Sequence, residues 1–194
     1  MNMEKKFELT DNFIINAFGV KLFQIKCTKS FKYAKEGDLG GYVEKDENLD
    51  QESDAWVYGN AWVYGDARVY GDAQVYGNAQ VYGNARVYGD ARVYGDAQVY
   101  GDARVYGDAR VYGNADIEND NNHCGFDCFG SCNRHTHAYL TKDNKVEITC
   151  GCFRGSIEEF EKEVEKTHSG KIYEKQYKAI INVIKIKFGL TDLI

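Results

Sequence analysis

Apolar and polar residues alternate in a fixed six-residue pattern along the middle of the chain. From Asp54 to Ala115 the order Ala-X-Val-Tyr-Gly-Asp/Asn is written ten times. In an extended segment Ala and Val point to one face, while X and Tyr point to the other. Gly followed by Asp or Asn favours a bend, because both positions tolerate positive φ. The pattern predicts a mainly β fold, in which a coil of short strands stacks on itself around a narrow Ala and Val core.

The repeated unit resembles the hexapeptide-repeat family, which includes acyltransferases and γ-type carbonic anhydrases. Val57 and Ala61, and each pair after them, match the aliphatic and small inward positions of that family. The resemblance implies a left-handed parallel β-helix with three hexads per coil, so the chain would form about four coils. Many members of the family are homotrimers, and the resemblance implies the same assembly here. It implies little about activity, because one fold hosts many functions.

A coil of eighteen residues sorts the X positions into three faces. The first face carries Trp56, Gln74, Arg92 and Arg110, the second Trp62, Gln80 and Gln98, and the third Arg68, Arg86 and Arg104. The third face would be a column of arginines at the strand spacing of about 4.8 Å. Like charges placed opposite one another are unfavourable, so this column requires acidic neighbours or a bound anion.

Two interpretations of the arginine column are open. In the first, aspartates at the corners and planar stacking on tyrosines neutralise it; these residues are Asp66, Asp72, Asp90, Asp102, Asp108, Tyr64, Tyr70, Tyr88 and Tyr106. In the second, the arginines and the neighbouring tyrosines form a groove for an anion or a nucleotide, because guanidinium groups bind phosphate and aromatic rings stack on bases. The predicted ligand-binding residues of this groove are Arg68, Arg86, Arg104, Tyr70, Tyr88 and Tyr106.

The repeat also places ten tyrosines on the outside of the coils, including a column of Tyr58, Tyr76, Tyr94 and Tyr112. So much aromatic surface on a thin prism favours packing against further copies of the chain. A narrow core of about four coils also favours self-association, together with caps at both ends of the solenoid. The expected partner is therefore the chain itself, as a homotrimer.

The residues before the repeat are predicted to cap it, with a first domain over residues 1–42 and a β-helix over residues 43–118. Alternation over Lys21–Cys27 predicts a strand, and Gly37–Gly41 is expected to form a tight turn. Between Val43 and Asp54 the hexad continues in degraded form, with Leu49 in an Ala position and Ser53 in a Gly position. Terminal repeats are often atypical.

Residues 123–194 are predicted to form a small α+β domain of two strands and two helices. The strands are expected over residues 135–141 and 146–150. Ser156 and Glu159 form a capping box for a helix with Ile157, Phe160 and Val164 on its apolar face. A second helix, over about residues 172–188, is expected to bury Tyr177, Ile180, Ile181 and Ile184.

Histidines and cysteines concentrate in this C-terminal region. Thiolates and imidazoles bind zinc tetrahedrally, and the candidate ligands are Cys128, Cys132, His135 and His137. The alternative is that the cysteines are small core residues and the histidines are hydrogen-bonded. The spacing matches no standard zinc signature, so the prediction favours no cofactor, with zinc as the alternative.

Composition narrows the classes of function. The net charge is −6 and the isoelectric point is near 5.3, which argues against general nucleic-acid binding. No apolar run has the length of a membrane span, and Met1–Lys6 is not followed by the apolar region of a signal peptide. We therefore expect a cytoplasmic protein without membrane contact, whose six cysteines are thiols.

The catalytic residues of the resembled enzymes are missing from the repeat. Hexapeptide acyltransferases use a histidine base and γ-type carbonic anhydrases use three metal-binding histidines, but residues 54–115 contain no histidine. A histidine from the C-terminal domain of a neighbouring subunit is the remaining route to catalysis. The sequence therefore favours a non-catalytic binding protein.

The whole layout looks like a group of hexapeptide-repeat proteins carried by phages and their bacterial hosts, on the strength of Gly37–Gly41, Cys150–Phe153 and Glu159-Phe160. For such a protein, sequestering a small anionic nucleotide signal of host defence is the function expected. Arg154 and His168 are further ligand-binding candidates in the C-terminal domain. The alternatives are an acyltransferase-like enzyme and a purely structural spacer or oligomerisation scaffold.

Overall fold

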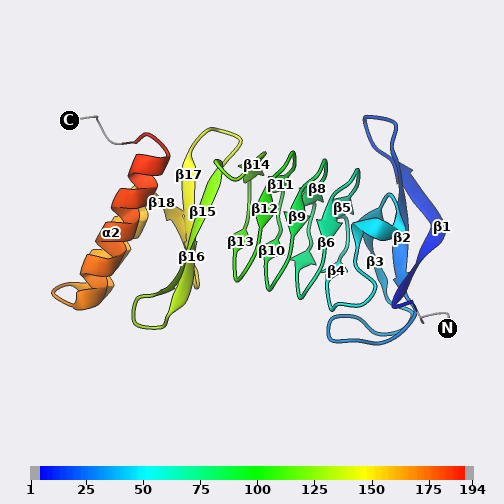
Figure 1. The fold of residues 1–194 in the computed structure, drawn as a ribbon, viewed down its shortest axis with the longest axis horizontal. Helices are drawn as coiled ribbons and strands as arrows, with labels where there is room; N and C mark the ends of the chain where they lie inside the picture. The colour runs from blue at the N-terminus through cyan, green and yellow to red at the C-terminus, as the bar shows by residue number, and fades with distance from the viewer. Residues whose placement is uncertain (1–4, 191–194) are drawn as a thin grey trace. The chain divides into compact units, whose positions relative to one another are not determined.

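The computed structural model describes residues 5–190 of the chain, which falls into two compact units, residues 1–120 and 121–194 (Figure 1). Each unit is treated by itself below. The expectation that no signal peptide begins the chain rests largely on Met1–Glu4, which lie outside the described residues. The residues predicted as a separate N-terminal cap belong to the same compact unit as the coils.

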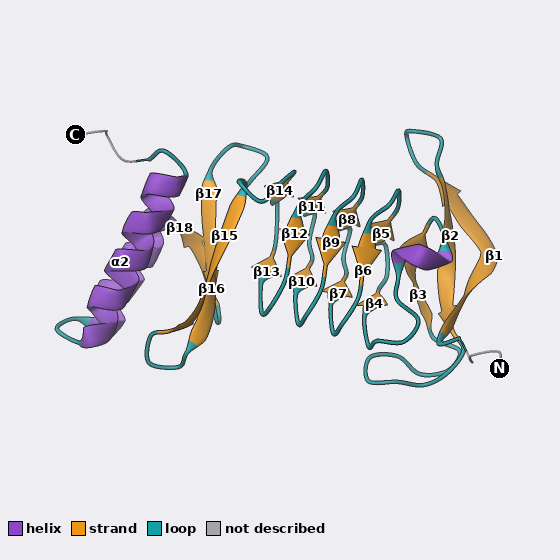
Figure 2. Ribbon diagram, viewed as in Figure 1, coloured by secondary structure: helices purple, strands orange, loops and turns teal. Residues whose placement is uncertain are grey.

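The repeat forms a parallel β-solenoid of about four coils, which confirms the predicted fold (Figure 2). Its strands have two residues each: β4 Trp56–Val57, β5 Trp62–Val63, β6 Arg68–Val69, β7 Gln74–Val75, β8 Gln80–Val81, β9 Arg86–Val87, β10 Arg92–Val93, β11 Gln98–Val99, β12 Arg104–Val105, β13 Arg110–Val111 and β14 Asp116–Ile117. Every third strand pairs in parallel, in the orders β4-β7-β10-β13, β5-β8-β11-β14 and β6-β9-β12. The predicted sorting of X positions into three faces is confirmed by these registers.

Local chemistry explains why six residues make one side of the coil. The Ala and Val of each hexad are buried, as expected for inward positions of a narrow prism. The glycine of each hexad has positive φ, for example 70° at Gly89, and turns the chain into the next side. Backbone amides then donate to carbonyl groups of the next coil, as in Arg86 N to Ala103 O at 2.9 Å and Tyr88 N to Val105 O at 3.0 Å. Each coil therefore satisfies the polar backbone groups of the one below it.

The N-terminal segment adds antiparallel strands to one of the three sheets. These strands are β1 Phe7–Ile15, β2 Lys21–Cys27 and β3 Leu39–Val43, and the sheet runs β1-β2-β3-β5-β8-β11-β14. The strand expected over Lys21–Cys27 is confirmed, while β1 was not predicted. Trp56, in the first complete coil, is buried by ring contacts with Phe7 and Phe31 at centroid distances of 6.3 and 5.4 Å. This segment covers the first coil as a cap would.

The tight turn predicted over Gly37–Gly41 is wrong in its second half, because Leu39 already begins β3. Gly40 and Gly41 are needed for close approach. An added Cβ would lie 2.7 Å from Val57 O at Gly40 and 2.6 Å from Ala61 O at Gly41. The two glycines therefore let β3 lie against the backbone of the first coil, while the bend itself is at Gly37, where φ is 92°.

The position predicted for Leu49 is also wrong. Leu49 forms a parallel bridge with Val69, so it fills a Val position rather than an Ala position. In this first turn Val43 pairs with Val63, twenty residues later, whereas the later coils repeat every eighteen. The spacing from Leu49 to Val57 is eight residues rather than six, so the two additional residues lie in the corner between them. The 3₁₀-helix η1, Asp46–Asn48, precedes this corner.

The second unit has four strands rather than the two predicted, followed by the two predicted helices. The antiparallel sheet runs in chain order, with β15 His123–Phe129, β16 Arg134–Leu140, β17 Val146–Cys150 and β18 Phe153–Ser156, followed by α1 Ile157–His168 and α2 Ile172–Lys187. Neither β15 nor β18 gives a clear apolar alternation, since β18 has only four residues with one apolar side chain, and β15 contains Gly and Asp.

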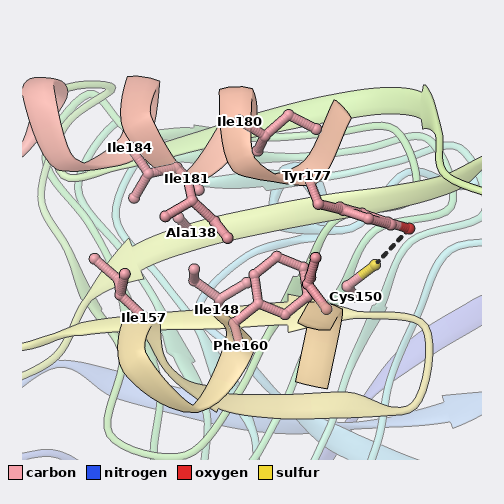
Figure 3. Close-up of a cluster of buried hydrophobic side chains, with 10 residues drawn as sticks. Ala138, Ile148, Cys150, Ile157, Phe160, Tyr177, Ile180, Ile181 and Ile184 are labelled. Atoms are coloured by element: carbon pink, nitrogen blue, oxygen red, sulfur yellow. Dashed lines mark hydrogen bonds between the residues drawn. The ribbon is translucent and has the colours of Figure 1, made fainter. Parts of the chain in front are cut away.

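The core of the second unit packs both helices against one face of the sheet (Figure 3). Ala138, Ile148 and Cys150 of the sheet meet the helix residues Ile157, Phe160, Val164, Tyr177, Ile180, Ile181 and Ile184, all buried. The capping box at Ser156 and Glu159 is confirmed, since each side chain accepts from the backbone N–H of the other residue. None of the helices within residues 5–190 has the length and apolar character needed to cross a bilayer.

Candidate functional site

The arginine column lies on the β6-β9-β12 face of the solenoid, as predicted. The strand registers pair Arg68 with Arg86 and Arg86 with Arg104. All three side chains are exposed. Within residues 5–190 their guanidinium groups form no hydrogen bond or ion pair. Successive strands of a parallel sheet lie about 4.8 Å apart, so the three arginines form one column of positive charge.

The corner aspartates do not neutralise this column by direct pairing. Asp66 pairs with Lys45 Nζ at 2.9 Å, and Asp72 pairs with Lys32 Nζ at 2.7 Å. The ammonium group of Lys45 also lowers the pKa of Asp66, so this carboxylate remains ionised. Asp102 accepts a hydrogen bond from Asn84 Nδ2 at 3.0 Å. At these three corners the carboxylates pair directly with other residues, while the positive charge of Arg68 also contributes to the lowered pKa of Asp66.

The tyrosines stack on one another rather than on the arginines. Tyr70 and Tyr88 are parallel, with centroids 4.9 Å apart and planes 2° apart, and Tyr88 and Tyr106 lie 5.4 Å apart at 17°. Tyr106 ends the column and is exposed, with 54% of its surface accessible. Each arginine of the column precedes one of these tyrosines by two residues in the sequence. The predicted ligand-binding residues of the solenoid therefore form two columns, one of arginines and one of tyrosines. Both columns run from coil to coil along the β6-β9-β12 side.

A depression of about 730 Å³ lies at the N-terminal end of these columns. Arg68, Tyr70, Gly71 and Arg86 line it from the coils, together with Val69, and the irregular first turn contributes Asp46, Glu47, Leu49, Asp50, Gln51, Glu52 and Ser53. The corner with two additional residues thus forms one wall. The lining therefore includes four acidic residues besides the two arginines, and one of them, Asp46, forms an ion pair with Lys5. The depression combines groups of both charges, while the rest of the column is basic.

This depression was missed in the sequence because Leu49 was aligned to the wrong position of the hexad. The signal that indicates it is the spacing of eight residues between Leu49 and Val57 in a chain that otherwise repeats every six. An insertion in a solenoid bulges outward, because the inward positions of the coil remain filled. Here Leu49 fills the Val position with 1% of its surface exposed, and the residues after it form the wall.

Arg154 and His168, the other predicted ligand-binding residues, belong to the second unit. Arg154 lies on β18, where its guanidinium pairs with Glu147. His168 ends α1, where its ring stacks on Tyr177 at a centroid distance of 5.5 Å. Both side chains therefore have contacts within the second unit. The arginine column belongs to the first unit.

The four candidate zinc ligands do not converge in the second unit. Cys128 and Cys132 are exposed, at the irregular end of the β15–β16 hairpin. The ring of His135 is hydrogen-bonded to the carboxylate of Asp127, with 2.5 Å between Nδ1 and Oδ1, and the ring of His137 shares a hydrogen bond with that of His123 at 2.9 Å. Among residues 5–190, no three His, Cys, Asp or Glu side chains are placed to hold a metal ion. The positions of these side chains therefore do not support the predicted zinc site. None of the six cysteines forms a disulfide.

The comparisons with known proteins concern the solenoid. The family model of the YdcK β-solenoid repeat matches five overlapping stretches, residues 61–77, 73–86, 79–95, 85–101 and 97–113. All of them lie within the coils, so the hexads are β-solenoid repeats, as the resemblance implied. A search among curated proteins finds no significant match to the chain. The repeat assigns the fold of this region without assigning an activity.

Proposed function

We propose that this β-solenoid repeat protein is a non-catalytic binding protein that sequesters a small anionic ligand of the nucleotide type. The ligand lies along the arginine column, with phosphate groups on Arg68, Arg86 and Arg104 and a base against the neighbouring tyrosine column. The observation that carries the proposal is the unpaired state of these three exposed guanidinium groups within residues 5–190. Their fork geometry suits bidentate binding of phosphate oxygens.

The column supports binding rather than catalysis. A ligand with two phosphate groups spans two successive arginines, because adjacent strands of a parallel sheet are about 4.8 Å apart. Tyr106, which ends the tyrosine column with 54% of its surface exposed, offers aromatic surface beside them, of the kind on which bases stack. Residues 54–115 supply no histidine for acid–base chemistry. An acyltransferase-like activity would need that group from elsewhere, and no contact in the solenoid supports one.

The assembly in this proposal is a homotrimer acting in the cytoplasm, and phage origin fits the likeness of the whole layout. The tyrosine columns support self-association, since stacked rings such as Tyr76 and Tyr94, with centroids 4.7 Å apart, present continuous aromatic strips on the outside of the prism. Packing these strips against other copies removes them from water. Native mass spectrometry of the gently purified protein measures the subunit number and any retained ligand mass together.

The binding site is tested by isothermal titration with a cyclic dinucleotide, a linear nucleoside diphosphate and inorganic phosphate. Arg86→Glu places a carboxylate in the middle of the column and is expected to weaken nucleotide binding at least tenfold, because it replaces a phosphate donor with a repulsive charge. Arg92→Glu is the matched control, with the same charge change at the same hexad position on the β4-β7-β10-β13 face. It should leave the affinity within twofold of the wild type.

Three outcomes oppose the proposal in different ways. Equal loss in both variants would assign the effect to net charge rather than to the arginine column. Unchanged affinity in Arg86→Glu would move the site away from the solenoid. A trimer that binds none of the probes would instead favour the structural spacer, for which the uninterrupted coils from Ala55 to Ile117 are the supporting feature.

A further inference from the structure

Helix α2 has a second apolar face that the fold of its own unit does not use. Four of its apolar residues are exposed: Ile172 (61%), Ala179, Val183 (48%) and Ile186 (60%). Leu190, just beyond the helix, is also exposed (54%). Successive members are seven, four, three and four residues apart, which is the spacing of one seam of a coiled coil. We call these five residues the outer stripe.

The outer stripe lies opposite the core-facing side of α2. Tyr177, Ile180, Ile181 and Ile184 are buried among the sheet and α1, as Figure 3 shows. At 3.6 residues per turn, the mean directions of the two sets differ by about half a turn. A helix that packs on one side only would carry polar residues at the outer positions. The outer stripe is therefore unexplained by the packing of α2 in its own unit.

The end of α2 holds the last residue of the stripe in place. Gly189 has φ of 66°, its N–H donates to Ile186 O at 3.2 Å, and Leu190 N–H donates to Lys185 O at 2.8 Å. This pair of bonds is a Schellman motif, which ends a helix and fixes the residue after the glycine. Leu190 thus extends the stripe at a defined position.

The charges beside the outer stripe are positive. Lys171 and Lys175 flank it on one side and Lys187 on the other, as the helical positions require. The one acidic residue of α2, Glu174, lies toward the opposite side and pairs with Lys178 Nζ at 2.7 Å. Lys175 is exposed and forms no ion pair within residues 5–190. The chain as a whole has a net charge of −6, so this helix face is basic in an acidic protein.

We propose that the outer stripe of α2 is a docking surface for an acidic amphipathic helix of a partner protein. The narrow seam suits a partner helix whose apolar residues repeat every three and four positions. The lysines beside it complement Glu or Asp at the flanking positions of that partner. This interaction is separate from the ligand binding proposed for the solenoid.

The same charges argue against two other occupants. In a pair formed by two copies of α2, the lysines of one copy would face those of the other, which is unfavourable. An anionic membrane surface would attract the lysines, but helices that lie in a bilayer present a broader apolar face than this seam, commonly with Trp or Phe. The outer stripe of α2 contains neither Trp nor Phe.

The test measures binding of a fluorescent synthetic helix to the full chain by anisotropy. The probe is a four-heptad peptide with Ile and Leu at its seam and Glu at the flanking positions; a second peptide carries Lys in place of Glu. The wild type should bind the acidic peptide at least tenfold more tightly than the basic one. Ile186→Ser and Lys175→Glu should each weaken binding of the acidic peptide at least fivefold. Lys162→Glu, an exposed charge change on α1, should not alter it.

The other occupants are separated by two further measurements. Sedimentation velocity tests whether Ile186→Ser changes the subunit number, and flotation tests binding to vesicles that contain phosphatidylserine. A fall in subunit number would show that α2 pairs with a second copy and would overturn the proposal. Vesicle binding without peptide binding would overturn it in favour of a membrane surface. Equal binding of both peptides, or of neither, would also overturn it. Circular dichroism of each variant verifies that the exposed substitutions leave the fold intact.

Discussion

The spacing between the coils can be tested at the corners of the solenoid by replacing one glycine with alanine. Gly89 and Gly107 occupy the same corner of successive coils, with φ of 70° and 63°. A Cβ on Gly89 would lie 2.9 Å from Gly107 N and 3.3 Å from its Cα, both backbone atoms of the next coil. A Cβ on Gly107 would meet nothing within 4 Å. The two variants therefore share the conformational strain but only one has the steric clash.

The size of the difference follows from these contacts. An alanine held at positive φ costs about 1–2 kcal/mol, and the stiffer unfolded chain offsets about 0.4–1 kcal/mol of that. Gly107→Ala should thus lower the free energy of unfolding by about 1 kcal/mol. Gly89→Ala must in addition separate two coils whose backbones are joined by hydrogen bonds, such as Tyr88 N to Val105 O at 3.0 Å. Overpacking against a rigid neighbour adds about 1–3 kcal/mol.

The assay is denaturant unfolding monitored by tryptophan fluorescence. Both tryptophans, Trp56 and Trp62, lie in the solenoid, so the signal reports on the first unit alone. So few coils are expected to unfold together, because each is stabilised only by its neighbours. Equal destabilisation by the two variants would refute the argument, because it would show that close approach between coils adds nothing to the strain at the glycine. Wild-type stability of Gly89→Ala would refute the strain argument as well.

Three further predictions concern the same unit and the same fluorescence assay. Leu49→Ala should lower the free energy of unfolding by about 2–5 kcal/mol, because it empties a fully buried position beneath Val69; a loss below that of an exposed Ala substitution would contradict the assigned position. Burial lowers the pKa of Lys6 to about 8, so the unfolded chain binds more protons above that pH, and stability should rise as the pH increases from about 8 toward 10; Lys6→Met should remove this rise. Burial raises the pKa of Tyr64 to about 12, so stability should fall as the pH increases from about 10 to 12, and Tyr64→Phe should make that fall shallower.

The repeat made most of the solenoid predictable. A six-residue period with one inward Ala and one inward Val requires a coil, and the eighteen-residue register then places Arg68, Arg86 and Arg104 in one column. The Tyr columns followed from the same register. These predictions succeeded because each depends on one strict period, and a one-residue slip would turn every inward side chain outward.

The segments outside the repeat were harder to predict because they lack such a period. The first turn of the solenoid has two more residues than the others, and only the pairing of Leu49 with Val69 reveals which positions remain inward. The strands β15 and β18 are held by pairing with β16 and β17 more than by their own apolar pattern. The histidine and cysteine cluster suggested a metal site in the sequence, but distances between side chains decide whether ligands converge.

By itself, the sequence determined the coil, its three faces and the positions of the outward Arg and Tyr residues, because inward size and corner conformation repeat every six residues. Tertiary structure alone decided which charges are paired. Asp66 and Asp72 pair with Lys45 and Lys32, which are distant in the chain, rather than with the arginine column. It also decided that Leu49 fills a Val position of the coil, through its pairing with Val69. Both decisions depend on contacts between distant segments, and a local pattern does not contain them.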